Sequence, residues 1–301
     1  MISVVIPLYN KEQFIQHTLE AALGQTYQDF EIVIVDDGST DNSVSEARKV
    51  NDPRIRIVSQ ENAGVSAARN RGIEEARYDL IAFLDADDEW KPTYLETQMA
   101  LAEKYPQCNV FATNYEFRDA EGNTRPTIIR RLPFDGEDGV VTNYFEVASH
   151  SHPPICSITI MVRKTAIQEI GGFPVGIAAG EDLLTWARLA VRNDIAYSKK
   201  PLAVFIKETF VFNTKPRRRP ADIDIVSQEL RILKESFPQT KGIKSYISHW
   251  HKMRCAIYYQ LGEKKNSIRE ALKALKYNVF NYKLYAYILM NIIPLKKLNK
   301  E

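Results

Sequence analysis

The first 85 residues alternate between short apolar runs and stretches whose apolar residues recur at helical spacing. The four apolar runs are Ile2–Ile6, Phe30–Val35, Arg54–Ser59 and Asp79–Leu84. Runs of this kind are typical of strands that are buried on both faces of a sheet. The stretches between them, such as 14–23 and 63–76, have the length of crossover helices. This alternation predicts βαβ units, and we expect an α/β fold whose mostly parallel central sheet is flanked by helices.

The regular alternation ends near Trp90. Beyond it we expect helices over 92–104, 165–170 and 181–192, and strands over 109–117, 127–131, 157–163 and 203–206. After the basic run Lys215–Pro220 the chain is helical in pattern and rich in Lys and Arg to its end. The sequence therefore predicts one α/β domain over residues 1–215 and a C-terminal basic helical extension over 216–301.

The composition is that of an ordinary globular protein, with 45% hydrophobic and 26% charged residues among 301. A formal net charge of +2 gives no reason to expect a nucleic-acid partner. Cys108, Cys156 and Cys255 are scattered and odd in number, which fits a reducing compartment better than a disulfide framework. The chain begins with an apolar strand pattern and not a signal peptide, and no stretch reaches the roughly 20 apolar residues that cross a bilayer. We therefore expect a cytoplasmic location.

Several carboxylates follow the fourth apolar run directly, in the sequence Asp85-Ala86-Asp87-Asp88. The carboxyl end of a parallel strand is the edge at which open α/β sheets bind ligands. Carboxylates gathered at one place repel one another unless a cation lies among them. Mg²⁺ typically takes one or two carboxylates and completes its shell with water and substrate phosphates. These residues therefore suggest a divalent metal that holds a nucleotide diphosphate, with Asp88 as a turn or capping residue.

The ends of the first two strands offer groups that suit a nucleoside. Neither a GxGxxG nor a GxxxxGK[ST] motif occurs, which disfavours a Rossmann dinucleotide site and a P-loop. Tyr9 follows the first strand and presents a flat ring that could stack on a base, although a packing role is the simpler explanation when this residue is taken alone. Asp37 follows the second strand, and its carboxylate can accept a hydrogen bond from a base such as uracil. An alternative role for Asp37 is helix capping, for which Asp41 is the better candidate.

Two further positions lie at predicted helix starts. Gly64 permits close approach of the backbone to an anion at a helix N-terminus, and Arg69 lies within that helix, where the sequence does not determine which way its side chain points. Glu181 and Asp182 open a later helix. For these two acids, charge compensation of the helix dipole and general-base catalysis both remain open.

These segments together resemble the family 2 glycosyltransferases, which have the GT-A fold. The matching elements, in chain order, are Val4–Asn10, Asp36–Asp41, Asn62–Gly64 with Ala68–Asn70 and Gly72, Asp85–Asp88, Gly171–Phe173, and Gly180–Asp182. Each motif is weak alone, but the ordered set is specific and covers about residues 1–210. The remaining residues carry no motif of this family.

The resemblance implies a nucleotide-binding half over residues 1–95, in which Pro7, Tyr9 and Asp37 line the nucleotide pocket. Asp85 and Asp87 match the DxD motif, which implies a divalent metal, Mn²⁺ or Mg²⁺. Asp87 is then the more direct metal ligand, and Asp85 lies nearer to the ribose and diphosphate. We assign Gly64 and Arg69 to the same donor, for which the family commonly uses a UDP-sugar.

The resemblance further implies an acceptor half over residues 96–215, with Asp182 as the catalytic base of an inverting transfer. The acceptor is expected to be a saccharide or a lipid-linked saccharide in surface polysaccharide or glycolipid synthesis. We place Glu181, Trp186 and Phe173 near that acceptor. Many relatives carry a second acid where this chain has Leu184, a departure that concerns the acceptor contacts and leaves the base in place.

The stretch Tyr277–Leu295 combines Tyr, Phe, Ile and Leu with surrounding lysines. Such a helix suits the interface of a membrane, which would place the protein peripherally at the inner face of the plasma membrane. Packing against its own catalytic domain and a contact in a homodimer explain the same composition.

Two other functions compete with sugar transfer. A sugar-phosphate nucleotidyltransferase would be expected to carry a glycine-rich, basic loop after its first strand, and Pro7–Asn10 is not such a loop. A non-catalytic nucleotide-sugar-binding protein could lose the metal-binding or base carboxylates, and this chain retains both.

Overall fold

The computed structural model describes residues 1–207 and 218–293, and the chain divides into two compact units, residues 1–210 and 211–301. The domain boundary expected at residues 215 and 216, and the first half of the Lys215–Pro220 run, lie outside the described residues. The two units are described separately below.

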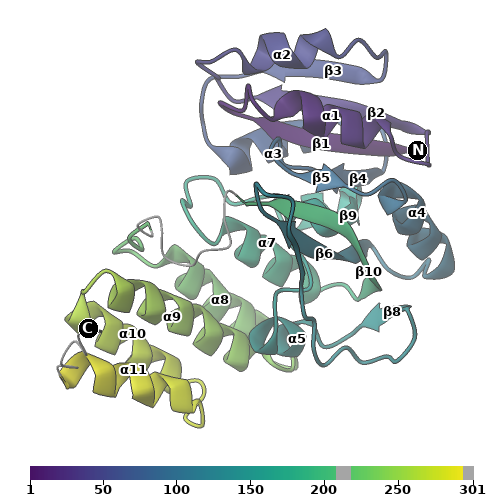
Figure 1. The fold of residues 1–301 in the computed structure, drawn as a ribbon. Helices are drawn as coiled ribbons and strands as arrows, with labels where there is room; N and C mark the ends of the chain where they lie inside the picture. Colours follow the sequence, from purple (N-terminus) through teal and green to yellow (C-terminus); the bar gives the residue numbers. More distant parts are fainter. Residues whose placement is uncertain (208–217, 294–301) are drawn as a thin grey trace. The chain divides into compact units, whose positions relative to one another are not determined.

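The first half of the N-terminal unit is built from βα repeats. Its elements are β1 (Ile2–Leu8), α1 (Ile15–Leu23), β2 (Phe30–Asp36), α2 (Ser43–Lys49), β3 (Ile55–Ser59), α3 (Val65–Glu75) and β4 (Leu80–Phe83). The strands pair in parallel in the order β3-β2-β1-β4 (Figure 1). Leu8 of β1 pairs with Asp36 of β2, and the backbone N–H of Asp37 donates to the Leu8 carbonyl at 2.8 Å. The chain segments after both strands therefore leave the sheet side by side.

The second half extends the same sheet with antiparallel and parallel pairs. Its elements are β5 (Glu89–Trp90), α4 (Tyr94–Lys104), β6 (Val110–Arg118), β7 (Thr124–Pro126), β8 (Asp138–Val141), α5 (Tyr144–His150), a 3₁₀ turn η1 (Ser157–Thr159), β9 (Ile160–Arg163), α6 (Lys164–Glu169), α7 (Glu181–Ala190) and β10 (Ile195–Ile206). The main path of the sheet is β3-β2-β1-β4-β9-β6-β10-β5, with β9 antiparallel to both neighbours and β6 parallel to β10. The sheet is mixed and mostly parallel, as the sequence predicted.

Three local predictions for this half were wrong. The strand expected over 127–131 lies at Thr124–Pro126, the strand expected from residue 157 begins at Ile160 after the turn η1, and β10 begins at Ile195 and not at residue 203. Short or edge strands such as β7 have little apolar alternation of their own, because pairing to a neighbour decides where they form. Asn10 lies in the loop between β1 and α1. Its backbone has a positive φ of 52°, and its side chain bonds Thr40.

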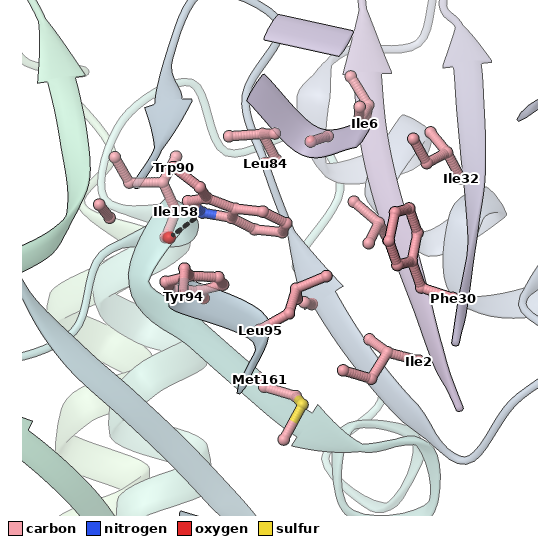
Figure 2. Packing of buried hydrophobic residues seen from close by; sticks show 14 of the residues in the cluster. Ile2, Ile6, Phe30, Ile32, Leu84, Trp90, Tyr94, Leu95, Ile158 and Met161 are labelled. Atoms are coloured by element: carbon pink, nitrogen blue, oxygen red, sulfur yellow. Dashed lines mark hydrogen bonds between the residues drawn. The ribbon is translucent and has the colours of Figure 1, made fainter. Parts of the chain in front are cut away.

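The apolar core lies against β1, β2 and β4, whose side chains are almost entirely buried. Figure 2 shows Trp90 of β5 among Leu84, Tyr94 and Leu95, with its indole N–H donating to the Ile158 carbonyl at 2.8 Å. The rings of Trp90 and Tyr94 stack with centroids 4.2 Å apart. This packing fixes the segment that directly follows the Asp85–Asp88 turn.

The C-terminal unit consists of helices, namely α8 (Ile225–Ser236), α9 (Ile243–Gln260), α10 (Lys264–Leu275) and α11 (Tyr282–Ile292). α10 packs between α9 and α11 (Figure 1), around Cys255, Ala271, Ala274 and Leu284. Among the helices of residues 1–207 and 218–293, none has the length and apolar content needed to cross a membrane.

Candidate active site

A cavity of about 380 Å³ opens where β1, β2 and β4 end and α3 begins. Its lining comprises Pro7, Leu8, Tyr9, Lys11, Asp37, Asn62, Gly64, Val65, Ala68, Arg69, Asp85, Ala86 and Asp87. All seven residues that the sequence assigned to donor binding are in this lining. Parallel strands bring them together because the segments after strand ends far apart in sequence meet at one edge of the sheet.

Asp37 ties the end of β2 to the loop that precedes α3. Its carboxylate accepts hydrogen bonds from the Gln60 side chain at 2.7 Å and from the backbone N–H groups of Ala63 and Gly64 at 3.0 and 2.8 Å. A carboxylate offers about four acceptor positions, so three bonds fix Asp37 and leave capacity for a donor on a ligand. Tyr9 is half-exposed beside it and presents its ring to the cavity.

Gly64 stands immediately before α3 with φ +88°, a backbone conformation that residues with a Cβ rarely adopt. A Cβ added there would meet no atom within 4 Å, so the backbone faces open space. The first turn of α3 is thereby accessible from the cavity, as an anion at a helix N-terminus requires.

The two acids of the DxD pattern differ in how firmly they are held. Asp85 accepts from Arg69 Nη2 and from Ser157 Oγ, both at 2.7 Å, so each of its oxygens already has a partner. Asp87 has one ion pair, with Lys11 Nζ at 2.5 Å, and its side chain is 38% exposed against 22% for Asp85. Asp87 therefore loses fewer interactions than Asp85 when its carboxylate exchanges its present partner for a ligand.

Sequence reasoning missed Lys11. It lies three residues beyond β1, in the same segment as Tyr9, and its ammonium group forms an ion pair with the carboxylate of Asp87. The carboxylate oxygens of Asp85 and Asp87 are hard ligands of the kind that fits Mg²⁺ or Mn²⁺. A lysine so close after a strand end at the ligand-binding edge was the available signal.

Arg69 is buried and carries unused hydrogen-bonding capacity. Its Nη2 bonds Asp85, whereas Nε and Nη1 are buried without a hydrogen-bond partner. Burial tends to lower the pKa of Arg69, but the charges of Asp85, Asp182 and Glu181 raise it, and its guanidinium lies 5.2 Å from the Phe173 ring. Buried unpaired donors are unfavourable, so this guanidinium is suited to an oxyanion that enters the cavity.

Asp182 lies in the first turn of α7, which starts after Gly180. Burial raises the pKa of Asp182, and the charge of Asp85 raises it further, while the hydrogen bond from the Leu183 N–H (2.7 Å) and the charge of Arg69 act in the opposite direction. Burial and the charge of Asp182 also raise the pKa of Glu181. A carboxylate with a raised pKa accepts a proton more readily than an ordinary aspartate.

The structure contradicts an acceptor contact for Phe173 and Trp186. Their side chains are 1% and 0% exposed, and their rings pack edge to face with centroids 5.6 Å apart. Phe173 also packs against Phe83 of β4 at 5.2 Å. Both rings belong to the core against which α7 packs, so they offer no surface to a ligand. They contribute only indirectly, by holding the helix whose first turn contains Asp182. Of the three residues assigned to the acceptor, Glu181 alone keeps partial exposure.

Asp88 is a turn residue, as predicted: its backbone N–H donates to the Asp85 carbonyl at 3.0 Å, and its side chain is buried. Its carboxylate accepts from the Ile206 N–H of β10 at 2.9 Å. Burial raises the pKa of Asp88 well above its usual range, and the charges of Asp85 and Asp87 add to this effect. The bond joins the turn that holds Asp87 to the last residue of the longest strand.

A second group of potential metal ligands lies in the C-terminal unit. One ligand atom each of Asp224, His251 and Glu270 lies within 4.8 Å of the others. The guanidinium of Arg254 forms ion pairs with both acids, with Nε 3.2 Å from Asp224 and 3.4 Å from Glu270. We therefore interpret the group as a buried ion-pair network that holds α9 and α10 to the start of α8.

Comparison with known proteins identifies the family and the fold of this chain. The family model described as glycosyl transferase family 2 matches residues 3–170. Among solved structures, Staphylococcus aureus TarS in complex with UDP-GlcNAc superimposes with a TM-score of 0.70 at 18% identity, over 96% of this chain and 84% of that one. The mannosyltransferase PcManGT of Pyrobaculum calidifontis, in complex with GDP-Man and Mn²⁺, gives 0.59 at 17% identity over 97% and 84%. These similarities show the GT-A fold.

Curated relatives agree with the family model. The uncharacterized glycosyltransferase YibD of Escherichia coli is 50% identical over 103 residues, which are 34% of this chain and 30% of that protein. A Bacillus subtilis protein named as a teichuronic acid biosynthesis glycosyltransferase, TuaG, is 30% identical over 65% of this chain and 75% of its own length. The matched segment spans about a third of the length of YibD and of the rickettsial relatives.

Proposed function

The chain belongs to glycosyl transferase family 2, and from this premise we propose that it moves a sugar from a nucleotide-diphosphate sugar to a saccharide or lipid-linked saccharide. A UDP-sugar is the proposed donor, and transfer inverts the anomeric centre. The observation that carries the proposal is that Tyr9, Asp37, Arg69 and the Asp85/Asp87 pair line the same cavity. Asp182 interacts electrostatically with Arg69 and Asp85, which makes it a separate carboxylate next to the donor site.

Each part of the donor has matching chemistry in the cavity. Tyr9 offers a stacking face for the base, and the fixed carboxylate of Asp37 accepts an N–H of that base. The unpaired Nε and Nη1 of Arg69 suit the diphosphate. The structures of TarS in complex with UDP-GlcNAc and of PcManGT in complex with GDP-Man support a nucleotide-sugar donor for a chain of the same fold.

We assign a divalent cation, Mn²⁺ or Mg²⁺, to Asp87 as its direct ligand, with Asp85 nearby in an orientation held by Arg69 and Ser157. When bound, such an ion stabilises the negative charge of a departing nucleoside diphosphate. Lys11 would release Asp87 and remain beside the diphosphate as a second positive charge. Mn²⁺ in the PcManGT structure supports this choice of ion.

In the proposed reaction Asp182 acts as general base. Its carboxylate removes the proton from an acceptor hydroxyl, and the hydroxyl oxygen attacks the anomeric carbon of the donor sugar. The bond from that carbon to the diphosphate oxygen breaks in the same displacement, so the configuration inverts and the nucleoside diphosphate leaves. The raised pKa of Asp182 improves proton abstraction, and the partly exposed Glu181 beside it is the proposed acceptor contact.

We propose a role in surface polysaccharide or glycolipid synthesis, in keeping with the name of TuaG. If the acceptor is lipid-linked, the enzyme works at the cytoplasmic face of the plasma membrane, and the basic C-terminal unit is its proposed peripheral contact.

A thermal-shift screen tests the donor site directly. UDP, GDP, dTDP and their sugars are added to the full chain with Mn²⁺, with Mg²⁺ or with EDTA. A ligand at about 100 times its Kd stabilises a protein by about 2.7 kcal/mol, which is a shift of several degrees. We expect such a shift with UDP-sugars and Mn²⁺, its loss in Asp87→Ala, and its retention in the control Asp135→Ala, whose exposed carboxylate lies outside the cavity. If no nucleotide shifts the wild-type transition with either ion, the proposed donor site is wrong.

A further inference from the structure

Helix α11 is apolar on two opposite faces. Leu284, Tyr287, Ile288 and Asn291 face α9 and α10 and are buried or partly buried. Tyr282, Tyr285, Leu289 and Ile292 follow one another at helical spacing on the other face and are exposed by 74%, 46%, 55% and 62%. A surface helix of a globular protein normally carries polar residues there.

The loop before α11 extends this exposed apolar surface. Val279 and Phe280 lie directly before the helix and are 53% and 91% exposed, and Ile293 follows the helix at 54%. We call these residues, together with the exposed face of α11, the α11 face. Single exposed apolar residues are ordinary, but a continuous series of aromatic and aliphatic side chains indicates a surface with a partner.

The segment of the chain that contains the α11 face carries charges of one sign. Residues 271–300 contain six lysines and neither Asp nor Glu. Among the described lysines, Lys276 and Lys283 are exposed. Burial lowers the pKa of Lys252 on α9, and the positive charge of Lys283 lowers it further, so these two ammonium groups lie close enough to repel. The whole C-terminal unit has 19 Lys and Arg against seven Asp and Glu.

This charge pattern decides between the partners. In a two-fold dimer through the α11 face, each copy would present its lysines to those of the other, with no carboxylate on the segment to pair with them. A nucleic acid would match the lysines and could stack on the aromatic rings, but it offers nothing to Leu289, Ile292 and Ile293. An anionic bilayer matches both features, since acyl chains receive the apolar side chains and headgroups attract the lysines.

We infer that the α11 face binds the surface of a bilayer that contains anionic lipids, with Phe280 and the exposed stripe of α11 inserted at the headgroup level. The helix lies in the plane of the interface and does not cross it. The purpose of this contact rests on the proposed function, because a bilayer surface is where a lipid-linked acceptor is met. The contact itself can be measured without any sugar transfer.

The test is vesicle flotation of the full chain. Vesicles of phosphatidylcholine are compared with vesicles that contain about 30% phosphatidylglycerol, at about 0.1 M and about 0.5 M salt. We expect binding to the anionic vesicles that exceeds binding to the neutral ones by about tenfold or more and weakens at high salt. Lys276→Gln and Lys283→Gln should each lower that binding by about fivefold.

A matched pair of double variants isolates the apolar part. Phe280→Ser with Leu289→Ser removes exposed side chains from the α11 face, and Ile223→Ser with Ile232→Ser removes side chains that are 70% and 54% exposed elsewhere in the same unit. The first variant should lose binding by about tenfold, and the second should stay within about twofold of the wild type.

Three results would overturn the inference. They are equal loss in both double variants, a wild-type dimer without lipid that dissociates in Phe280→Ser/Leu289→Ser, and binding to RNA in the absence of vesicle binding. The nucleotide thermal shift is measured on the same samples. A normal shift without vesicle binding refutes this inference alone, whereas vesicle binding without any nucleotide shift refutes the proposed donor site alone.

Discussion

The two units of this chain carry opposite charge. Residues 1–210 contain 21 Lys and Arg against 31 Asp and Glu, whereas residues 211–301 contain 19 against seven. The net charge of +2 is the small remainder of a strongly acidic unit and a strongly basic one. The acidic unit contains the carboxylates proposed for chemistry, and the basic unit contains the surface proposed for lipid. The difference teaches that overall net charge says little about partners when two folded units divide it.

Each unit also contains a buried acid, and the pKa values of these two acids shift in opposite directions. The acids are Asp88 in the first unit and Glu270 in the second. Burial raises the pKa of Asp88, and its carboxylate neighbours Asp85 and Asp87 raise it further. Burial would also raise the pKa of Glu270, but hydrogen bonds from His251 and Lys273 and the charge of Arg254 outweigh it and lower the pKa to about 2. Neighbouring charge therefore decides the state of a buried acid.

The largest expected effect is the loss of sugar transfer in Asp182→Asn, a change in the acidic unit that should leave lipid binding by the basic unit intact. Asp182→Asn keeps the shape of the side chain but removes the proton acceptor, so transfer should fall by about 10²–10⁴-fold. Binding of nucleotide and of anionic vesicles should remain at the wild-type level, since neither needs the base. The measurement is sugar transfer from the donor that the thermal-shift screen selects, and transfer within a few fold of wild type would remove Asp182 from the role of base.

The second prediction concerns a variant, Glu270→Ala, that disrupts the ion-pair network of the basic unit. Glu270→Ala leaves Arg254 buried without one of its two acids, and losing one partner of a buried pair typically destabilises by about 3–5 kcal/mol. Hydrogen exchange of the amides of α9 and α10 should accelerate accordingly, while exchange in β1, β2 and β4 stays unchanged. Lys273→Ala, which removes only the partly exposed partner of Glu270, is the control and should have a small effect. Unchanged exchange in α9 would show that the network contributes little.

The two buried acids predict opposite responses to pH. Glu270 has a lowered pKa in the folded state, so its stabilising contribution is complete above its unfolded pKa and is lost as pH falls from about 4.5 toward about 2. Asp88 has a raised pKa, so its contribution is most favourable at low pH and declines as pH rises past the ordinary Asp pKa toward the raised value.

Asp88→Asn tests the second half of this contrast. The amide oxygen can still accept from the Ile206 N–H, and the variant carries no charge at neutral pH. We expect a stability gain on the order of 1 kcal/mol at pH 7 and none at pH 3, measured by denaturant unfolding in EDTA. A loss of stability at pH 7 would mean that ionised Asp88 is favourable in the folded protein.

The smallest expected effect concerns Lys11. Replacing it by Met frees Asp87 from an ion pair that is about one-third exposed, and such pairs are worth about 0–1 kcal/mol. Without nucleotide, Mn²⁺ should therefore bind Lys11→Met up to about fivefold more tightly than wild type, whereas Lys104→Met, which breaks the exposed pair with Asp138, should bind Mn²⁺ unchanged. Weaker Mn²⁺ binding by Lys11→Met would contradict the view that Lys11 competes with the cation for Asp87.

The sequence predicted the parallel half of the sheet and seven of the residues that line the cavity, because both depend on order along the chain. Buried strands are readable as apolar runs, and residues directly after Leu8, Asp36 and Phe83 must meet at one edge once those strands pair in parallel. What failed depends on packing. Nothing local to Phe173 or Trp186 reveals that their rings face the core, and nothing in Asp88 reveals Ile206, which lies 118 residues away.

Lys11 was present in the sequence, but its role could be recognised only from the fold. Lys11 gains its role from the carboxylate of Asp87, 76 residues distant along the chain. The basic character of the C-terminal residues was predicted from the sequence, but the excess of acids over residues 1–210 was not part of that prediction.

The central claim is that Asp87 holds a divalent cation at a nucleotide-diphosphate site. Electron paramagnetic resonance of Mn²⁺ tests it most directly, because the sharp signal of free Mn²⁺ disappears when the ion is bound to a protein. With UDP present, and with a UDP–Mn²⁺ sample without protein as reference, wild-type chain should remove the free signal at stoichiometric concentration. Asp87→Ala should leave that signal at the level of the reference, whereas equal Mn²⁺ binding by wild type and Asp87→Ala would contradict the account.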